Sequence, residues 1–436
     1  MWVLSLIATF CLLFVWTEAA DTAHNKVVCV YDSRSFARES QGKMILADLE
    51  PALTFCTHLV YGYAGIQPDT YRMVPLNENL DTDKGHALYR HVAAFNKKYP
   101  GLKVLLSVGG GVDAEDKDKY NLLLESPEAR TKFINSAVLL TKQYGFDGLD
   151  VAWEFPENKP KKIRGTVGSI WHGFKKLFKT TPVDENAEMH REGYTAFIRE
   201  LKQAFRPEKL ILTATVLPNV NSTIYYDVPA IINNLDYVHL EGFDYYTPER
   251  NPSEADYTAP LYEAYERTPG NNINHLTQYW LTNGAPGSKI VLGVATFGRT
   301  WKMTSGSNIA GVPPLEEMDG AGEEGPYSKT PGLLSYPEVC AKLINPDNKK
   351  GLQPHLRKVL DPSKRFGTYA YRVPNDDGEG GLWVSYEDPD SAGDKANYVR
   401  AKGLGGVAIV DLSLDDFRGS CTGDKYPILR AAKYRL

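Results

Sequence analysis

Short apolar runs recur along the chain and alternate with amphipathic helical patterns. A run rich in Val, Ile and Leu that is bounded by polar or turn residues predicts a buried strand. Eight such runs occupy residues 27–31, 58–64, 103–108, 146–155, 210–217, 237–246, 289–297 and 406–413. Helical patterns between them include 85–99, 126–144 and 187–205. Eight β/α alternations predict an α/β fold, a closed parallel (β/α)8 TIM barrel.

One connection between the predicted strands is too long for this alternation. It runs from about 301 to 386 and contains Cys340, several turn signals and two strand-like pieces, 368–372 and 382–386. Long connections with elements of their own form separate small units. We therefore expect a small α+β subdomain inserted between strand 7 and helix 7 of the barrel.

The composition indicates an ordinary globular protein. The chain has 436 residues, 42% of them hydrophobic and 24% charged, with a formal net charge of −5. This charge gives no reason to expect nucleic acid or an anionic membrane as the partner of the whole molecule. A basic function must therefore be local.

The N-terminus has the pattern of a signal peptide. The apolar run 4–16 is too short for a comfortable membrane span, and small residues follow it at once. We expect residues 1–20 to be removed and the mature chain, 21–436, to be secreted without a transmembrane segment. A membrane anchor is the alternative, and the polar residues after the run argue against it.

Four cysteines remain if Cys11 leaves with the signal peptide. An even number in a secreted chain predicts disulfides. Cys29, Cys56, Cys340 and Cys421 allow three connectivities. Bridges from Cys29 to Cys56 and from Cys340 to Cys421 each join neighbouring parts of the chain, so we expect this pairing.

Asn221 begins the single Asn-X-Ser/Thr sequence of the chain. It follows a Pro-Asn turn, where a side chain is normally exposed. In a secreted protein such an asparagine is an acceptor for N-glycosylation.

The segment FDGLDVAWEFP at 146–156 resembles the fourth-strand signature of glycoside hydrolase family 18. Segments 107–110, 293–301 and 405–417 support the resemblance, which covers the whole mature chain. It implies a glutamate that protonates the leaving oxygen while the N-acetyl carbonyl of the substrate acts as nucleophile. A carboxylate two residues before that glutamate orients the acetamide.

Side chains alternate along a strand, so positions 150, 152 and 154 share the face that points into a barrel. Leu149, Val151 and Trp153 then face the helices.

The chain departs from the family pattern where chemistry is expected. Asp147, Asp150 and Glu154 are present, but Ala152 replaces the intermediate carboxylate. The other departures are Gly111 for an aromatic residue, Glu241 for methionine, Phe243 for tyrosine and Val410 for tryptophan. Each lost catalytic contact lowers the rate on the order of 10² to 10⁴. We therefore expect no hydrolysis, with Glu154 left as a buried acid that shares a proton with Asp150.

Sugar binding without turnover is a separate question. Val410 and Gly111 argue against tight chitooligosaccharide binding, because aromatic stacking contributes much of the affinity for a sugar ring. Tyr31, Asp244 and Arg299 are candidate weak sugar contacts. Each of them has a plain alternative role in the barrel core or as a loop anchor.

A basic insertion at about 157–182 follows the fourth strand, so it leaves from the C-terminal face of the barrel. Its five large apolar residues have helical spacing and predict a short amphipathic helix. This helix either packs over the mouth or forms a patch for an anionic glycan, a membrane surface or an acidic protein. The basic residues are Lys159, Lys161, Lys162, Arg164, Lys175, Lys176 and Lys179.

An insertion of this kind is a mark of the imaginal disc growth factors within the family. The resemblance implies a secreted, non-enzymatic factor that promotes proliferation and motility of imaginal-disc-type cells together with insulin-like signals. Its partners would be a cell-surface receptor, an insulin-like signalling partner or a matrix glycan, with no nucleic acid, cofactor or metal. The alternatives are a weak chitinase or transglycosidase and a chitin-binding lectin.

Overall fold

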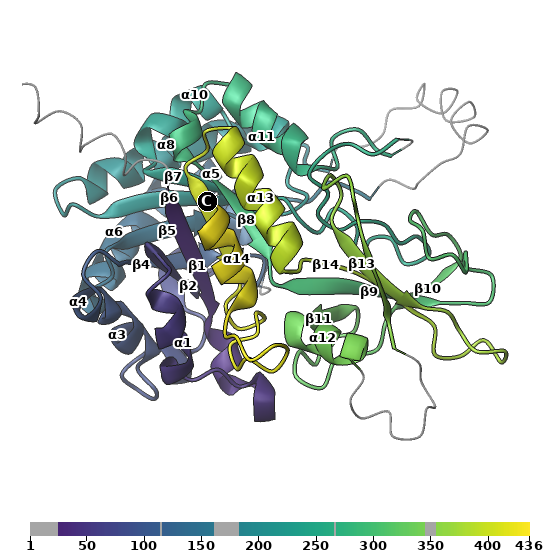
Figure 1. Cartoon of the computed structure of the whole chain (residues 1–436). Helices are drawn as coiled ribbons and strands as arrows, with labels where there is room; N and C mark the ends of the chain where they lie inside the picture. Colours follow the sequence, from purple (N-terminus) through teal and green to yellow (C-terminus); the bar gives the residue numbers. More distant parts are fainter. Residues whose placement is uncertain (1–24, 114–115, 161–182, 266, 345–354) are drawn as a thin grey trace, which may run out of the picture.

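The computed structural model describes residues 25–113, 116–160, 183–265, 267–344 and 355–436 (Figure 1). The predicted signal peptide, 1–20, lies outside these residues. So does the basic insertion from residue 161 to residue 182, which leaves only Lys159 of its basic side chains inside the described part.

Eight parallel strands form a closed barrel, as the sequence predicts. The sheet closes because β1 pairs with both β2 and β15, and the short β3 (Met73–Pro75) adds an antiparallel edge to β2. The barrel strands are β1 (Lys26–Asp32), β2 (His58–Ile66), β4 (Lys103–Gly109), β5 (Gly148–Ala152), β6 (Ile211–Val216), β7 (Tyr237–Leu240), β8 (Ile290–Ala295) and β15 (Gly406–Val410).

Two barrel strands end well before the predicted boundaries. β5 stops at Ala152, opposite Gly109, and β7 stops at Leu240, opposite Val216. No neighbouring strand continues the hydrogen-bonded ladder beyond these pairs, so the apolar residues that follow belong to loops at the barrel mouth.

Helices surround the barrel, and α13 and α14 lie side by side on its outside (Figure 1). No described helix is long and apolar enough to span a bilayer. The helices are α1 (Leu46–Leu53), α2 (Glu78–Asp81), α3 (Leu88–Ala93), α4 (Phe95–Lys98), α5 (Asp118–Glu125), α6 (Pro127–Tyr144), α8 (Ala187–Phe205), α9 (Ser222–Tyr225), α10 (Val228–Ile231), α11 (Ile273–Thr282), α13 (Pro389–Ala401) and α14 (Pro427–Arg435).

The predicted helices over 126–144 and 187–205 are confirmed, and Ser126 caps α6 by accepting a hydrogen bond from Ala129 N at 3.2 Å. The helical pattern predicted over 85–99 is confirmed only in part, because it forms two short helices that begin at Leu88 and Phe95. Ala87 has a left-handed φ of 52°, which delays the start of the helix, and a tight turn at Ala94 separates α3 from α4.

The inserted α+β subdomain is present and lies beside the barrel (Figure 1). Its antiparallel sheet has the order β10-β9-β14-β13-β12, and β11 pairs with β9. β13 and β14 coincide with the predicted pieces, whereas β9 begins at Phe297, before the expected boundary. Its elements are β9 (Phe297–Met303), β10 (Met318–Ala321), β11 (Leu333–Ser335), α12 (Tyr336–Ile344), β12 (Arg357–Leu360), β13 (Thr368–Arg372) and β14 (Leu382–Tyr386).

Side chains around β5 alternate as predicted. Leu149, Val151 and Trp153 are fully buried outside the barrel wall. The Trp153 ring lies 4.9 Å from that of Phe197 on α8 and 6.2 Å from that of Phe133 on α6. This aromatic packing fixes the helices against β5, so the intervening positions point inward.

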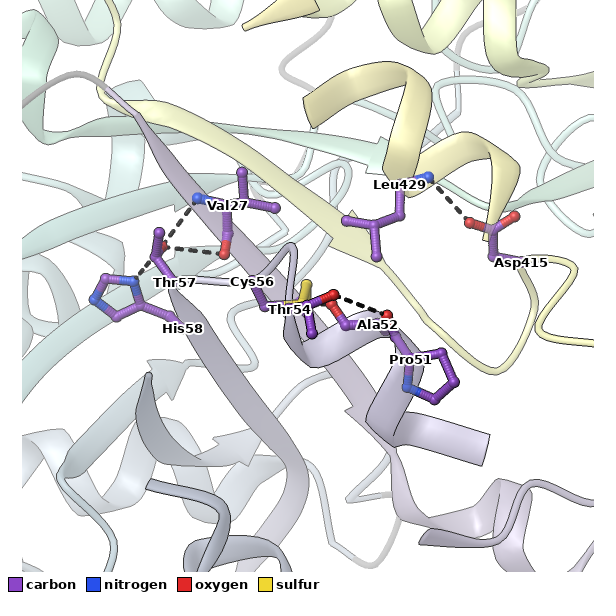
Figure 2. Close-up of a disulfide and its surroundings, with 10 residues drawn as sticks. Val27, Pro51, Ala52, Thr54, Cys56, Thr57, His58, Asp415 and Leu429 are labelled. Atoms are coloured by element: carbon purple, nitrogen blue, oxygen red, sulfur yellow. Dashed lines mark hydrogen bonds between the residues drawn. A yellow bond between two sulfur atoms is a disulfide. The ribbon is translucent and has the colours of Figure 1, made fainter. Parts of the chain in front are cut away.

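Both expected disulfides are present. Cys29 on β1 is joined to Cys56 before β2, and Figure 2 shows the surrounding contacts, in which Val27 N donates to Thr57 Oγ1 at 3.0 Å. Cys340 on α12 is joined to Cys421, which lies between β15 and α14. This bridge therefore connects the subdomain to the last loop of the barrel. The Cα atoms are 5.9 Å apart in each pair.

The longer disulfide loop is expected to stabilise the fold more. The bridges span 27 and 81 residues, and loop closure predicts roughly 3 to 5 kcal/mol each, with the larger value for Cys340–Cys421. Chemical denaturation of Cys340→Ser/Cys421→Ser should therefore show a larger loss of unfolding free energy than the matched pair Cys29→Ser/Cys56→Ser. Free thiols or another pairing in a peptide map of the secreted protein would contradict the assignment.

Candidate functional site

A cleft of about 1020 Å³ opens at the C-terminal mouth of the barrel. Parallel strands bring all of their carboxyl ends to this one face, so residues distant in sequence meet there. Its lining includes Asp32 at the end of β1, Glu154 after β5, Phe243 and Asp244 after β7, and Val410 at the end of β15.

Asp150 lies inside the barrel and joins three strands. Its carboxyl accepts hydrogen bonds from Ser107 Oγ on β4 at 2.8 Å and from Thr213 Oγ1 and Thr215 Oγ1 on β6 at 2.7 and 2.9 Å. Complete burial raises the pKa of Asp150, and the three hydroxyls partly oppose that rise. Asp150 therefore has a structural role that does not depend on catalysis.

Ala152 is at the position of the missing carboxylate and is 1% exposed. A small cavity of about 10 Å³ lies beside its methyl group, with Asp150, Thr215, His239 and Glu241 in its wall. This volume is room for about one water molecule. A methyl group can neither accept a hydrogen bond nor balance a positive charge, so this position cannot orient an acetamide.

Glu154 points into the cleft and is 9% exposed. Its Oε1 accepts a hydrogen bond from Asp113 N at 3.1 Å. Burial is the main cause that raises the pKa of Glu154, and the nearby Asp113 carboxylate raises it further. The prediction that Asp150 and Glu154 share a proton is wrong, because Asp150 takes hydroxyl donors inside the barrel while Glu154 takes a backbone donor at the mouth.

Asp147 is not part of the cleft. It precedes β5 at the opposite end of the barrel, where its Oδ2 accepts from Val104 N at 2.8 Å and from Asn96 Nδ2 at 3.1 Å. Asp147 thus anchors the start of β5, and the prediction that it is a vestigial catalytic residue is wrong.

The cleft has no aromatic side chain at positions 111 and 410, where the family pattern has one. Val410 is buried with Phe243, whose ring meets that of Phe297 edge-on at 5.8 Å. Gly111 has a φ of 73°, and a Cβ added there would meet no atom within 4 Å. Space for a side chain exists at this position, but the left-handed backbone disfavours one.

Asp244 and Arg299 line the cleft and satisfy one another. The guanidinium donates from Nε at 2.7 Å and from Nη2 at 2.6 Å to the two carboxylate oxygens. Tyr31 is different, because it is fully buried and packs edge-on against Tyr61 at 5.8 Å. The expected sugar contact through Tyr31 is therefore wrong, whereas Asp244 and Arg299 are accessible to a ligand in the cleft.

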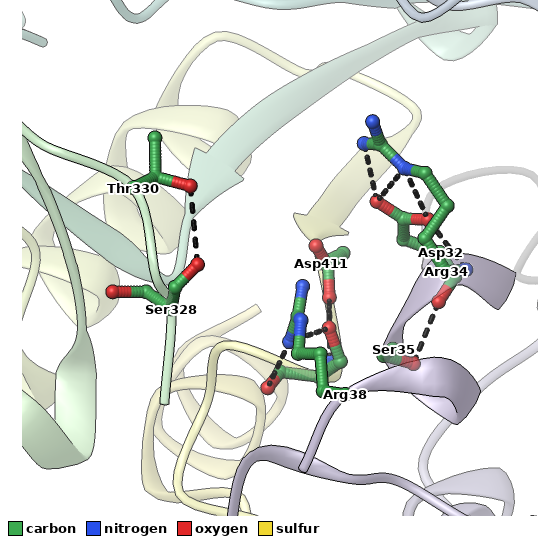
Figure 3. Close-up of polar contacts among 8 residues, drawn as sticks. Asp32, Arg34, Ser35, Arg38, Ser328, Thr330 and Asp411 are labelled. Carbon is green, nitrogen blue, oxygen red and sulfur yellow. Dashed lines mark hydrogen bonds and ion pairs between the residues drawn. The ribbon is translucent and has the colours of Figure 1, made fainter. Parts of the chain in front are cut away.

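A second polar wall follows β1 (Figure 3). Arg34 forms an ion pair with Asp32 at 2.6 Å, and Arg38 Nη1 donates to Ser413 Oγ at 3.0 Å. Burial, with Asp32 as the next cause, raises the pKa of Asp411 to about 6. Neither arginine is among the site residues expected from the sequence, although charged residues directly after a predicted barrel strand are a usable signal for the mouth.

The described ends of the basic insertion lie at the mouth. Lys159 and Val183, on either side of the gap, line a neighbouring cleft of about 640 Å³ together with Asn221. Arg250 holds the first end by pairing with Glu157 at 2.5 Å. Among the described residues, no group of three or more His, Cys, Asp or Glu could hold a metal ion.

Asn221 is half-buried and caps α9, and its Oδ1 accepts from Thr223 N at 3.0 Å and from Thr223 Oγ1 at 2.7 Å. The second residue after the asparagine thus contacts its amide oxygen.

Comparison with known proteins agrees with this geometry. The family model for glycosyl hydrolases family 18 matches residues 26–415. The chain is 67% identical over 415 residues to chitinase-like protein EN03 of Bombyx mori, covering 95% of both chains. It is 55% identical over 420 residues to imaginal disk growth factor 6 of Drosophila melanogaster, covering 94% of this chain and 93% of that protein.

Among solved structures, human YKL-39 superposes with a TM-score of 0.73 at 25% identity, covering 94% of this chain and 99% of that one. It is described as a pseudo-chitinase with retained chitooligosaccharide binding. On the closed barrel, the mouth cleft and these similarities, the chain belongs to glycoside hydrolase family 18, among its chitinase-like proteins and imaginal disc growth factors.

Proposed function

We propose that this chain is a secreted, non-enzymatic growth factor that promotes proliferation and motility of imaginal-disc-type cells in cooperation with insulin-like signals. The observation that carries the non-enzymatic part is Ala152. It places a methyl group beside Asp150 where the reaction needs a carboxylate that orients the acetamide nucleophile.

The growth-promoting part rests on similarity. Imaginal disk growth factor 6 is a growth factor by name, and this chain matches it over nearly its full length. We further propose that residues 1–20 are a signal peptide, that Asn221 is glycosylated, and that a cell-surface receptor or an insulin-like signalling partner recognises the secreted protein. The two disulfides suit an oxidising extracellular environment.

A chitin-binding lectin is the second candidate, with a weak chitinase or transglycosidase behind it. The lectin is favoured by the retained cleft and by the sugar binding stated for YKL-39. The loss of aromatic side chains at Gly111 and Val410 argues against tight binding of acetylated chitin oligomers.

The purified protein is expected to hydrolyse a fluorogenic chitooligosaccharide at a rate roughly 10² or more below that of an active family member. The reason is that the acid Glu154 is present, but no carboxylate at position 152 orients the acetamide of the substrate. Glu154→Gln is the matched control, since a residual rate that survives this change comes from a contaminant. A wild-type rate within about tenfold of an active enzyme would reject the proposal.

Restoring the carboxylate alone should not restore full activity. Ala152→Asp returns one charged group, but Phe243 and Val410 still leave the sugar poorly held. Steady-state kinetics of this variant should therefore show a rate well below that of an active family member. Full activity from this single substitution would mean that the rest of the pocket is intact.

The basic insertion is proposed to present its lysines to an anionic matrix glycan. Replacing Lys161, Lys162, Lys175 and Lys176 by Gln should shorten retention on a heparin column, and wild-type retention should fall steeply with salt because solvated charges are screened.

Four exposed lysines elsewhere, Lys97, Lys209, Lys329 and Lys402, give a control variant of equal charge change. If both variants and the wild type elute together with unchanged folding, the insertion is only a solvated cover and the glycan proposal fails.

A further inference from the structure

Glu241, directly after β7, carries a buried carboxyl without a cationic partner. The residue is 8% exposed, yet it lines the mouth cleft, the neighbouring cleft and the small cavity beside Ala152. The charged groups that act on it are Asp150 and Asp244, and both are acids. Among the described residues, neither an ion pair nor a side-chain hydrogen bond satisfies this carboxyl.

The arginines of the cleft are already engaged and cannot serve Glu241 without leaving their own partners. Each has at least one close polar contact of its own. The pairs are Arg34 with Asp32 at 2.6 Å, Arg38 with Ser413 at 3.0 Å, Arg250 with Glu157 at 2.5 Å and Arg299 with Asp244 at 2.6 Å.

The charged side chains of the whole cleft lining add up to a net negative charge. Eight acidic and five basic side chains line the cleft, so its field favours a positively charged ligand. The described part of the chain offers no cluster of three ligating side chains for a metal ion. A cation that needs only one carboxylate, such as an organic ammonium, fits this arrangement better.

The surroundings of Glu241 also indicate where the ammonium would lie. The methyl of Ala152 and the ring of Phe243 offer no hydrogen bond to a neutral acetamide, while Glu241 lines the small cavity beside Ala152. The cleft of about 1020 Å³ is large enough for an oligosaccharide.

We propose that the mouth cleft binds amino sugars that carry a free amine, with the Glu241 carboxylate paired to the 2-ammonium group of a glucosamine ring beside Ala152. Binding of such an amino sugar is a separate property from the proposed growth promotion, and neither property depends on the other. Burial, together with Asp150 and Asp244, raises the pKa of Glu241 well above its ordinary value. An ammonium group would place a positive charge beside the Glu241 carboxyl, where the charged neighbours that act on it are both acids.

Calorimetric titration of the full secreted protein with three probes tests the proposal. The probes are the fully deacetylated glucosamine tetramer, the N-acetylglucosamine tetramer, and spermine, which carries a similar charge without sugar rings. We expect the deacetylated tetramer to bind at least roughly tenfold more tightly than either of the others, because a charge-assisted hydrogen bond to a buried carboxylate is strong.

Glu241→Gln removes the charge with little change of shape and should weaken binding of the deacetylated tetramer by roughly tenfold while leaving the acetylated tetramer unaffected. Glu249→Gln is the matched control, since Glu249 lines the same cleft but is exposed. A melting temperature of Glu241→Gln no lower than that of the wild type shows that the variant is folded.

Four outcomes would overturn the proposal. Equal affinity for the two tetramers would mean that the amine is not recognised. Equal affinity for spermine would mean that only charge is recognised, and equal losses in Glu241→Gln and Glu249→Gln would mean that Glu241 is not the contact. Absence of binding by all three probes would also reject it, without bearing on growth promotion.

Discussion

Closure of the parallel sheet is the constraint on which the rest of this molecule depends. Because β1 pairs with both β2 and β15, every barrel strand has two neighbours and every carboxyl end opens at one mouth. The closed wall forces alternate side chains inward, where Asp150 joins β4, β5 and β6 through three hydroxyls. The same alternation sends Trp153 outward against α6 and α8. A cleft at the mouth is thus a consequence of the fold, whatever chemistry its lining allows.

Because the fold alone forms the cleft, a hydrolase-like site can lose its reaction and keep its architecture. Asp150 remains necessary because its hydrogen bonds hold the wall together. Ala152 can replace a carboxylate because a buried methyl group costs the barrel nothing in unsatisfied polarity. Glu154 retains a backbone donor from Asp113, so its carboxyl stays partly satisfied without a substrate. Glu241 is the exception, since it introduces a buried carboxyl that nothing in the described structure neutralises.

Much of the architecture could be predicted from sequence, because strand alternation, apolar runs and cysteine number act locally. The barrel, the subdomain, α6, α8 and both disulfides follow from such patterns. Features that depend on packing at a distance could not be predicted. Asp147 and Tyr31 lie away from the cleft because of the end and the side of the barrel wall that they occupy. The roles of Arg34 and Arg38 at the mouth could not be predicted, because they depend on the end of β1 lying next to the end of β15 (Figure 3).

The central claim is that the biological activity of this protein does not use the old catalytic acid. The most direct measurement is the growth response of imaginal-disc-type cells to the purified wild type and to Glu154→Gln, each with and without insulin. We predict the same half-maximal concentration for both proteins and a larger response when insulin is present. Loss of the growth response in Glu154→Gln, with folding and secretion unchanged, would contradict the account.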